Sequence, residues 1–353
     1  MITPKDMDRF TNNEVVNMYA KLNQDLTKTI IRQLRKAGDV SSFTRSQIVT
    51  LKRMGGNEVF KESLKKVSGL STKRKKEIMK LFDEIAQQEM SGYKTVYDSK
   101  GIEYKLNDSM IGILNYGIKV GNKDVSNLTQ SIAYASKKSY INAVDKLYKE
   151  VATGSYDYNT ALKRTVKDLA KKGITLKNSA GANEQIDVAV KRNLYTGIQR
   201  TAKDLAKEVG KQIDANCVVI GHSTKCRPSH HVIDAVTMSI DKFEKYEHLT
   251  EEYNCNHIVN YDWKPEYEGT KAKVESHDDR LSYGETIKNY KKVQKSNYYA
   301  RQVRAKKDAI ASGDKTKKAY QELKLAQKKY RTYCKQNGFE VDYLQTWKVG
   351  YNK

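Results

Sequence analysis

Proline is scarce in this sequence, and long apolar runs are absent. Three prolines in 353 residues favour long uninterrupted helices, because proline breaks a helix interior. No stretch approaches the roughly 20 apolar residues of a membrane-spanning helix, so we expect no membrane span. The first residues, MITPKDMDRF, lack the apolar segment of a secretory signal. Four cysteines without dense spacing indicate reduced thiols in a cytosolic setting rather than a disulfide framework.

In contrast to proline and long apolar runs, positively charged residues are abundant. Lys and Arg number 65 against 42 Asp and Glu, which gives a net charge of +23. Such a surplus favours binding to polyanions, most commonly nucleic acid. The alternative is solvated helix faces, since the lysines are spread along the whole chain. Hydrophobic residues make up only 38% of the sequence, a share typical of extended helices rather than one large core.

Apolar residues recur at helical spacing through the first third of the chain. In the first expected helix, over about 5–36, they step by three or four: Val15, Met18, Leu22, Leu26, Ile30 and Leu34. Ser41 or Ser42 is expected to cap a second helix that ends at Gly55-Gly56. Two further helices are expected over 57–67 and 71–90, which together predict a bundle of helices over 1–95.

The helical pattern continues through 96–215. Asp157 is expected to cap a helix that Gly173 stops, and a long helix is expected to end at Gly210. Between these two helices, the polar stretch ITLKNSAGANEQ predicts a loop or small hairpin. This range is therefore a second helical domain.

The apolar residues lose their helical spacing in a segment around 216–270. It holds five of the six histidines and three of the four cysteines. The β-branched runs 216–220 and 257–261 predict strands. The sequence therefore predicts a mainly α-helical protein with a small α+β module, whose boundaries we place at 216–275.

The last part, 276–353, returns to helix and becomes more basic. From 285 onward it has 18 Lys or Arg, 6 Asp or Glu and eight tyrosines. Basic residues interleaved with aromatics are typical of nucleic-acid contact, although such a helix can also be solvated with its tyrosines packed on a neighbour. Gly313-Asp314 is expected to break it into two helices, and Gly338 to end the second. The candidate nucleic-acid-binding residues are Lys291, Lys292, Lys295, Arg301, Arg304, Lys306, Lys307, Lys317, Lys318, Lys328, Lys329 and Arg331.

The histidines and cysteines of the module admit several interpretations. A structural zinc site would draw on thiolates and imidazoles, here Cys217, His222, Cys226, His230, Cys255 and His257. A nuclease-like or toxin-like enzyme would use histidines as general acid and base and an arginine to hold phosphate, here His222, Arg227, His230 and His257. A cysteine enzyme would pair Cys255 with His257. In the fourth interpretation, which the residues favour, these side chains form a hydrogen-bonded core that holds the turns together.

Several motifs resemble the phage minor capsid protein 2 family over roughly residues 40–275. They are Val219-Ile220-Gly221-His222, Cys226-Arg227-Pro228-Ser229-His230, Asn254-Cys255-Asn256-His257 and the stretch from Pro265 to Gly269. The module is also similar to the head-morphogenesis domain of Mu-type phages. Two positions depart from the family pattern: VIDAVTMS follows His230 in place of a Trp-Gln-Gly-Lys segment, and Asn256 replaces an arginine.

The resemblance implies a non-enzymatic minor head protein inside the virion, made in the host cytoplasm. Its implied partners are the portal protein, the major capsid or scaffold protein, and phage DNA, bound non-specifically. It further implies a role in head assembly or DNA ejection. No cofactor is expected unless zinc is bound.

Overall fold

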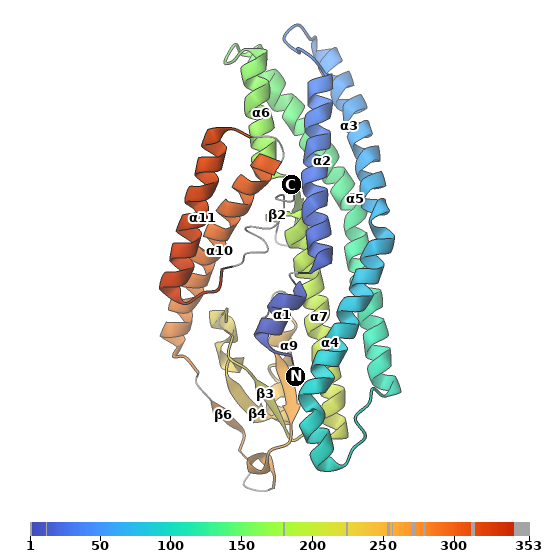
Figure 1. Cartoon of the computed structure of the whole chain (residues 1–353), viewed down its shortest axis with the longest axis vertical. Helices are drawn as coiled ribbons and strands as arrows, with labels where there is room; N and C mark the ends of the chain where they lie inside the picture. Colours follow the sequence, from blue (N-terminus) through green and yellow to red (C-terminus); the bar gives the residue numbers. More distant parts are fainter. Residues whose placement is uncertain are drawn as a thin grey trace. The chain divides into compact units, whose positions relative to one another are not determined.

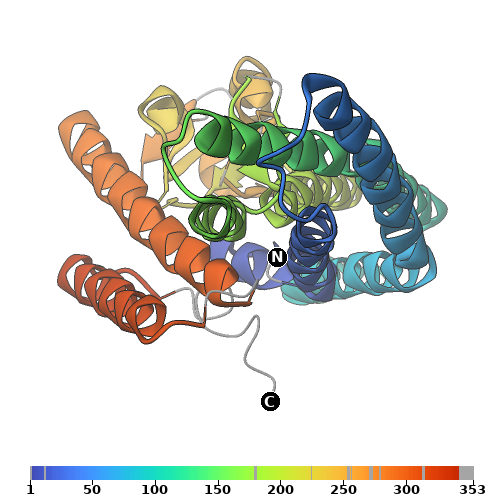
Figure 2. The same cartoon turned by 90° about the horizontal axis from the view of Figure 1, so that it is seen from above.

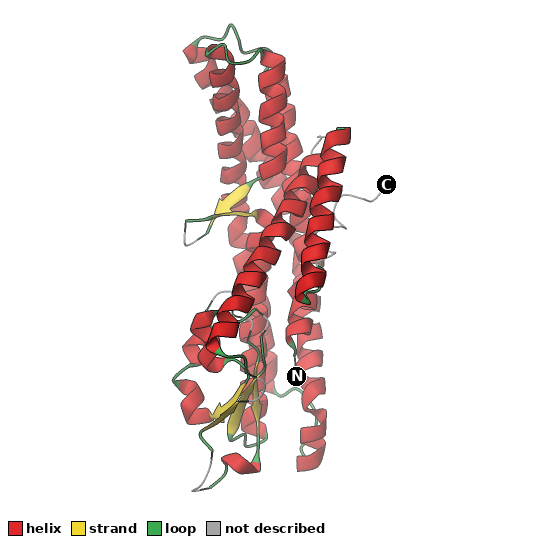
Figure 3. Ribbon diagram, turned by 90° about the vertical axis from the view of Figure 1, so that its left-hand side faces the viewer, coloured by secondary structure: helices red, strands yellow, loops and turns green. Residues whose placement is uncertain are grey.

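The structure is a computed structural model that describes residues 2–11, 13–178, 181–223, 225–252, 255, 257–269, 273–277, 280–311 and 315–341. These residues form eleven α-helices and two antiparallel sheets (Figures 1 and 3), which confirms the mainly α-helical fold class with a small strand module. Within the described part, no helix combines the length and apolar character needed to cross a membrane.

Long helices account for most of the chain, and the short strands lie between them in sequence. The helices are α1 (Pro4–Thr11), α2 (Glu14–Lys36), α3 (Arg45–Gly69), α4 (Ser71–Lys100), α5 (Asp108–Ala152), α6 (Tyr158–Lys172), α7 (Ile186–Gln212), α8 (Ile240–Glu244), α9 (Glu247–Thr250), α10 (Tyr283–Ala311) and α11 (Lys317–Asn337). The strands are β1 (Thr175–Lys177), β2 (Asn183–Gln185), β3 (Cys217–Ile220), β4 (Val236–Ser239), β5 (Val259–Asp262) and β6 (Glu275–His277), and the 3-10 helices are η1 (Pro228–Ile233) and η2 (Pro265–Tyr267).

The chain divides into two compact units, each built from three separate stretches. One unit contains Met1–Asn13, Arg74–Asp124 and Lys191–Lys295. The other contains Glu14–Lys73, Val125–Val190 and Ser296–Lys353. The four-part division expected from the sequence stays a prediction.

The unit that contains α2 follows the predicted helical periodicity. All six residues of the predicted apolar stripe on α2 are buried, because a 3.6-residue period places them on one face. β1 and β2 pair as an antiparallel hairpin, as the polar stretch before α7 predicts. The periodicity therefore identifies the buried face of this helix correctly.

Side-chain caps set the starts of two helices in this unit. Asp157 caps α6 as predicted, by accepting a hydrogen bond from the Thr160 N–H. The predicted cap at Ser41 or Ser42 is wrong, since α3 begins after Thr44. The Thr44 side chain accepts a hydrogen bond from the backbone N–H of Gln47, and the Gln47 side chain accepts one from the backbone N–H of Thr44. The two bonds form a capping box.

The predicted helix end at Gly55-Gly56 is also wrong, because α3 continues through both glycines. The pair marks a close approach between helices. A Cβ atom on Gly55 would lie 2.2 Å from the phenol oxygen of Tyr140 on α5, whose side chain is fully buried. Glycine is needed here because no side chain fits between α3 and that ring.

The basic C-terminal segment forms two helices, α10 and α11, that lie side by side (Figures 1 and 2). Gly338 ends α11 with a left-handed φ of +69°, as predicted. The predicted break at Gly313-Asp314 and the apolar last residues lie outside the described part of the chain. An apolar seam joins the two helices through Val303, Ile310, Leu323, Ala326, Tyr330 and Cys334.

The other unit contains a four-stranded antiparallel sheet in the order β5-β3-β4-β6. Strands are confirmed at 217–220 and 259–262, close to the two predicted runs. Val218, Met238 and Tyr261 of the sheet pack with Ala206 of α7 and Phe243 of α8. The small sheet thus buries its apolar side chains against a long helix, which a sheet of such short strands needs for stability.

The end of α7 differs from its prediction. The helix continues two residues past Gly210, to Gln212. A Cβ atom on Gly210 would lie 2.6 Å from Cβ of Tyr261, next to the backbone of β5. This glycine therefore lets α7 approach the sheet closely rather than ending the helix.

Candidate functional site

The segments that connect β3, β4 and β5 meet at one end of these three neighbouring strands. Ile220, the last residue of β3, pairs with Val236 at the start of β4 and with Val259 at the start of β5. Pro228 stands at the beginning of η1, where its fixed φ suits the first turn. The 3-10 helix η1, the segments on either side of it and the segment before β5 therefore converge. They carry His222, Cys226, His230, Asp234, Cys255 and His257.

Asp234 is the centre of a buried hydrogen-bond network. Its Oδ1 accepts a hydrogen bond from the Ser223 N–H at 2.8 Å and lies 3.0 Å from Nε2 of His257. Its Oδ2 lies 2.9 Å from Nδ1 of His222. Burial alone would raise the pKa of this fully buried carboxyl, but the hydrogen bonds from His257 and Ser223 hold the pKa below its ordinary value.

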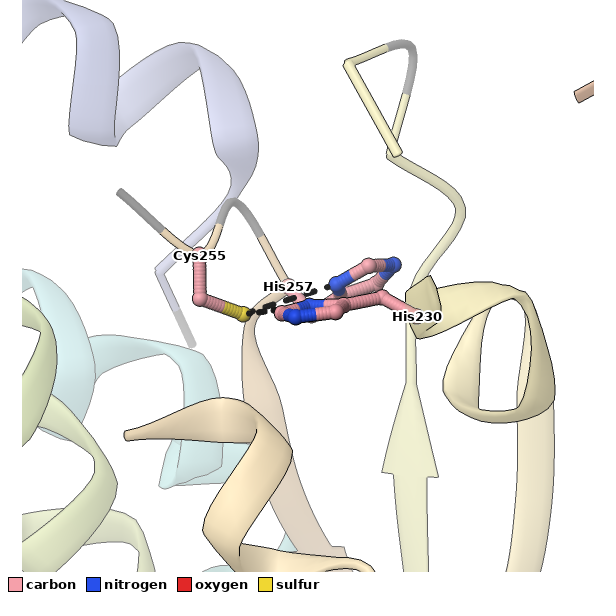
Figure 4. A group of neighbouring side chains, drawn as sticks. All are labelled: His230, Cys255 and His257. Carbon is pink, nitrogen blue, oxygen red and sulfur yellow. Dashed lines mark hydrogen bonds between the residues drawn. The ribbon is translucent and has the colours of Figure 1, made fainter. Parts of the chain in front are cut away.

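Cys255 faces two neighbouring histidines (Figure 4). Its Sγ is 3.5 Å from Nδ1 of His230 and 3.5 Å from Nδ1 of His257. All three residues are 1% exposed. Burial opposes ionisation of the thiol, but the two histidines outweigh it and lower its pKa to about 6.

The second nitrogen of each ring faces a carboxylate. Nε2 of His230 lies 3.0 Å from Oε2 of Glu252, and Arg227 donates to the same oxygen at 2.8 Å. Nε2 of His257 faces Asp234 in the same way. Each imidazole is thus oriented with Nδ1 toward Cys255, because its Nε2 is occupied by a carboxylate.

The candidate zinc residues of the sequence do not all come together. His230, Cys255 and His257 form one group whose ligand atoms lie within 4.8 Å of one another, and Cys226 forms a second such group with Asp234 and His257. Cys217 lies at the other end of β3, where its Sγ is 3.4 Å from the carbonyl oxygen of Asp262. The other three residues of β3, or about 10 Å of strand, separate it from the connections.

In the described part of the chain, the candidate acid–base residues contact other side chains of the protein. His230 and His257 are buried, and His222 is half-buried against Asp234. Arg227 forms an ion pair with Glu252. A phosphodiester does not reach the two buried rings in this arrangement, so the geometry favours a role in holding the module together.

Two important residues of this site, Asp234 and Glu252, were missed by sequence reasoning. Asp234 lies in the otherwise apolar run Val232-Ile233-Asp234-Ala235-Val236. An acidic residue inside such a run indicates a buried carboxylate that needs partners. Glu252 carries no comparable signal, because it follows another glutamate on an exposed turn.

The twelve candidate nucleic-acid-binding residues lie on α10 and α11, mostly at the surface. Arg304 lies 3.9 Å from Asp187, and Lys306 lies 2.8 Å from Glu322. Lys307 is 3% exposed, so its side chain does not reach an external phosphate. The exposed members are Lys291, Lys292, Lys295, Arg301, Lys317, Lys318, Lys328, Lys329 and Arg331.

The tyrosines among these basic residues divide into two kinds. Tyr330 is buried in the seam, and the rings of Tyr299 and Tyr333 pack with centroids 5.2 Å apart. Tyr298 and Tyr320 are exposed. Packing on a neighbouring helix therefore accounts for three tyrosines, and the exposed pair remains open to base stacking.

These features define a mainly α-helical protein with a buried polar module and a basic helix pair. The profile of the family "phage minor capsid protein 2" matches residues 2–335, nearly the whole chain, and the protein belongs to this family. The match extends well beyond the range over which the motifs resemble the family. No curated protein and no solved structure matches the chain.

Membership confirms the resemblance seen in the motifs. It makes the protein a minor component of the phage capsid and places it in the virion, at the phage head, where it interacts with other head components. The family is a structural one, which favours a role other than catalysis.

Proposed function

We propose that this minor capsid protein binds the portal and the major capsid or scaffold protein inside the phage head, and that α10 and α11 hold packaged DNA without sequence specificity. In this role it is made in the host cytoplasm, joins the head during assembly and takes part in DNA ejection. The observation that carries the DNA part is the helix pair itself. Six buried residues of the pair pack into the seam, while nine of the twelve candidate cations are exposed.

The charge of this segment supports phosphate contact. From residue 285 onward, 18 Lys or Arg against 6 Asp or Glu leave an excess of +12. Exposed cations at this density release counterions when they neutralise phosphates, so binding becomes steeply dependent on salt. The exposed Tyr298 and Tyr320 add aromatic surface beside the cations.

DNA binding is expected to depend on the exposed lysines of α11. The purified protein should bind a labelled duplex with an affinity that falls steeply between about 50 and 200 mM salt. Neutralising four lysines should weaken binding and reduce the slope of log affinity against log salt by up to about four, one for each phosphate that is no longer neutralised. Fluorescence anisotropy measures both quantities. The four changes are Lys317→Gln, Lys318→Gln, Lys328→Gln and Lys329→Gln.

A matched variant separates a binding surface from general positive charge. It removes four exposed lysines from α3 and α4 and should leave affinity and slope nearly unchanged. If both variants weaken binding equally, α11 is not the contact surface. Cleavage of the DNA that disappears in His230→Ala would instead favour the enzymatic alternative. The matched changes are Lys61→Gln, Lys65→Gln, Lys75→Gln and Lys76→Gln.

Binding to head proteins is tested in infected cells. We expect the tagged full-length chain, precipitated during assembly, to bring down the portal protein together with capsid or scaffold protein. Mass spectrometry identifies what accompanies it, and an unrelated tagged phage protein serves as the control. Recovery of the chain without any head protein would contradict this part of the proposal while leaving the DNA measurement unaffected.

A further inference from the structure

We propose that His230, Cys255 and His257 bind a zinc ion that fastens the connections of β3, β4 and β5 to one another. The ligand atoms are Nδ1 of both histidines and Sγ of Cys255, which converge in Figure 4. One thiolate and two imidazoles form a donor set that zinc prefers. The inference goes beyond the proposed role in DNA and portal binding and does not depend on it.

The distances between the donor atoms fit a tetrahedral ion. Zinc with a Zn–S bond of about 2.3 Å and Zn–N bonds of about 2.0 Å holds its sulfur and nitrogen ligands about 3.5 Å apart. Cys255 Sγ lies 3.5 Å from each of the two Nδ1 atoms. Since the three atoms also lie within 4.8 Å of one another, an ion fits among them without a large movement of the backbone.

The surroundings of the histidines are those of metal ligands. A histidine bound to a metal usually donates its other ring N–H to a carboxylate, which fixes the ring and its tautomer. Here His230 faces Glu252 at 3.0 Å and His257 faces Asp234 at 3.0 Å, each through Nε2. Two independent carboxylates thus leave both Nδ1 atoms pointing at the same sulfur.

An ion at this position explains why so many polar groups are buried beside such a small sheet. β3, β4 and β5 have four residues each. Burying two imidazoles, a thiol and a carboxylate costs free energy that short strands cannot easily offset. Structural zinc supplies folding free energy directly, because the complete ligand set exists only in the folded chain.

Cys226 belongs to a neighbouring group and not to the set of three ligands. It is buried, and its Sγ lies within 4.8 Å of both a ring nitrogen of His257 and a carboxylate oxygen of Asp234. Cys217, the other cysteine of the module, lies at the far end of β3. Because Cys217 lies away from the three ligands, replacing it should not affect zinc binding.

The expected result is about one zinc per chain in full-length protein purified without chelator, as a structural site with protein ligands implies. Atomic emission measures the metal. Replacing zinc with cobalt should give the intense visible bands of a tetrahedral site and a thiolate charge-transfer band in the near ultraviolet. The cobalt spectrum is read on the unaltered chain, so it reports ligation even where a variant fails to fold.

Serine variants locate the thiolate. Cys255→Ser should lose the bound zinc and the thiolate band, whereas Cys217→Ser, also buried in the same module, should retain both. Circular dichroism establishes whether each variant is folded. Retention of stoichiometric zinc in folded Cys255→Ser would overturn the assignment, as would the absence of zinc together with no cobalt spectrum in the unaltered protein.

A positioning residue gives a second test that leaves the ligands intact. Glu252→Gln should weaken zinc binding about 10- to 100-fold, the usual effect of losing a carboxylate behind a metal-bound histidine. Its neighbour Glu251 pairs with Lys203 instead, so Glu251→Gln should not change the affinity. Competition with a chromophoric chelator measures both values. Equal affinities in the two variants would contradict the role of Glu252.

Discussion

Asp234→Ala is expected to lower the free energy of unfolding by about 3–5 kcal/mol, the usual result of removing one partner from a buried charged network. The carboxylate holds His222, His257 and the Ser223 N–H at 2.8 to 3.0 Å. Alanine leaves His257 and the Ser223 N–H without their partner in the buried interior, and it also removes the partner of the half-buried His222. Urea unfolding followed by circular dichroism measures the change.

The loss should be concentrated in the sheet module. Hydrogen exchange in peptides covering 217–262 should become faster, because the connections of β3, β4 and β5 lose the residue that joins them. Asp241→Ala, an exposed aspartate on α8, is the matched control and should change stability by no more than about 0.5 kcal/mol. An effect of Asp234→Ala no larger than that control would show that the network does not hold the module.

Helices and strands of this protein could be predicted where the signal is local. The apolar stripe of α2, the Asp157 cap of α6 and the β-branched run of β3 each depend on residues close in sequence, and each is confirmed. The predictions that helices end at Gly55 and Gly210 were wrong for the opposite reason. Their role is set by tyrosines distant in sequence, which no local pattern identifies.

The candidate site was predicted only in part, again for a physical reason. Its histidines and cysteines are rare residue types in this chain, so their concentration is visible in the sequence. Which of them meet depends on strand length and register, which place Cys217 at the far end of β3. The carboxylates Asp234 and Glu252 are common residue types, and only the fold shows that they orient the imidazoles.

The basic helices illustrate a similar limit. Composition predicted a basic helical segment, and the structure contains one. Composition could not distinguish Lys307, which is buried, from Lys317 and Lys318, which are exposed, because the seam between α10 and α11 decides the orientation of each side chain.

Glu89→Gln is expected to stabilise the protein at pH 8 by about 3 kcal/mol and to have little effect at pH 4. Glu89 of α4 is 1% exposed and accepts a hydrogen bond from the Ile2 N–H at 2.8 Å. Burial raises its pKa from the ordinary 4.5 to about 7. Between these values the folded state holds the proton more tightly than the unfolded state, so stability falls as pH rises from about 4.5 to about 7.

Glutamine removes the titration and keeps an oxygen that accepts from Ile2. The free energy of unfolding of the variant should therefore exceed that of the unaltered protein by an amount that grows across this pH window and stays constant above it. Urea unfolding at a series of pH values measures both curves. Glu84→Gln, an exposed glutamate on the same helix, should give a curve parallel to the unaltered protein. A parallel curve for Glu89→Gln would mean that the buried carboxyl ionises without cost, which its burial on α4 argues against.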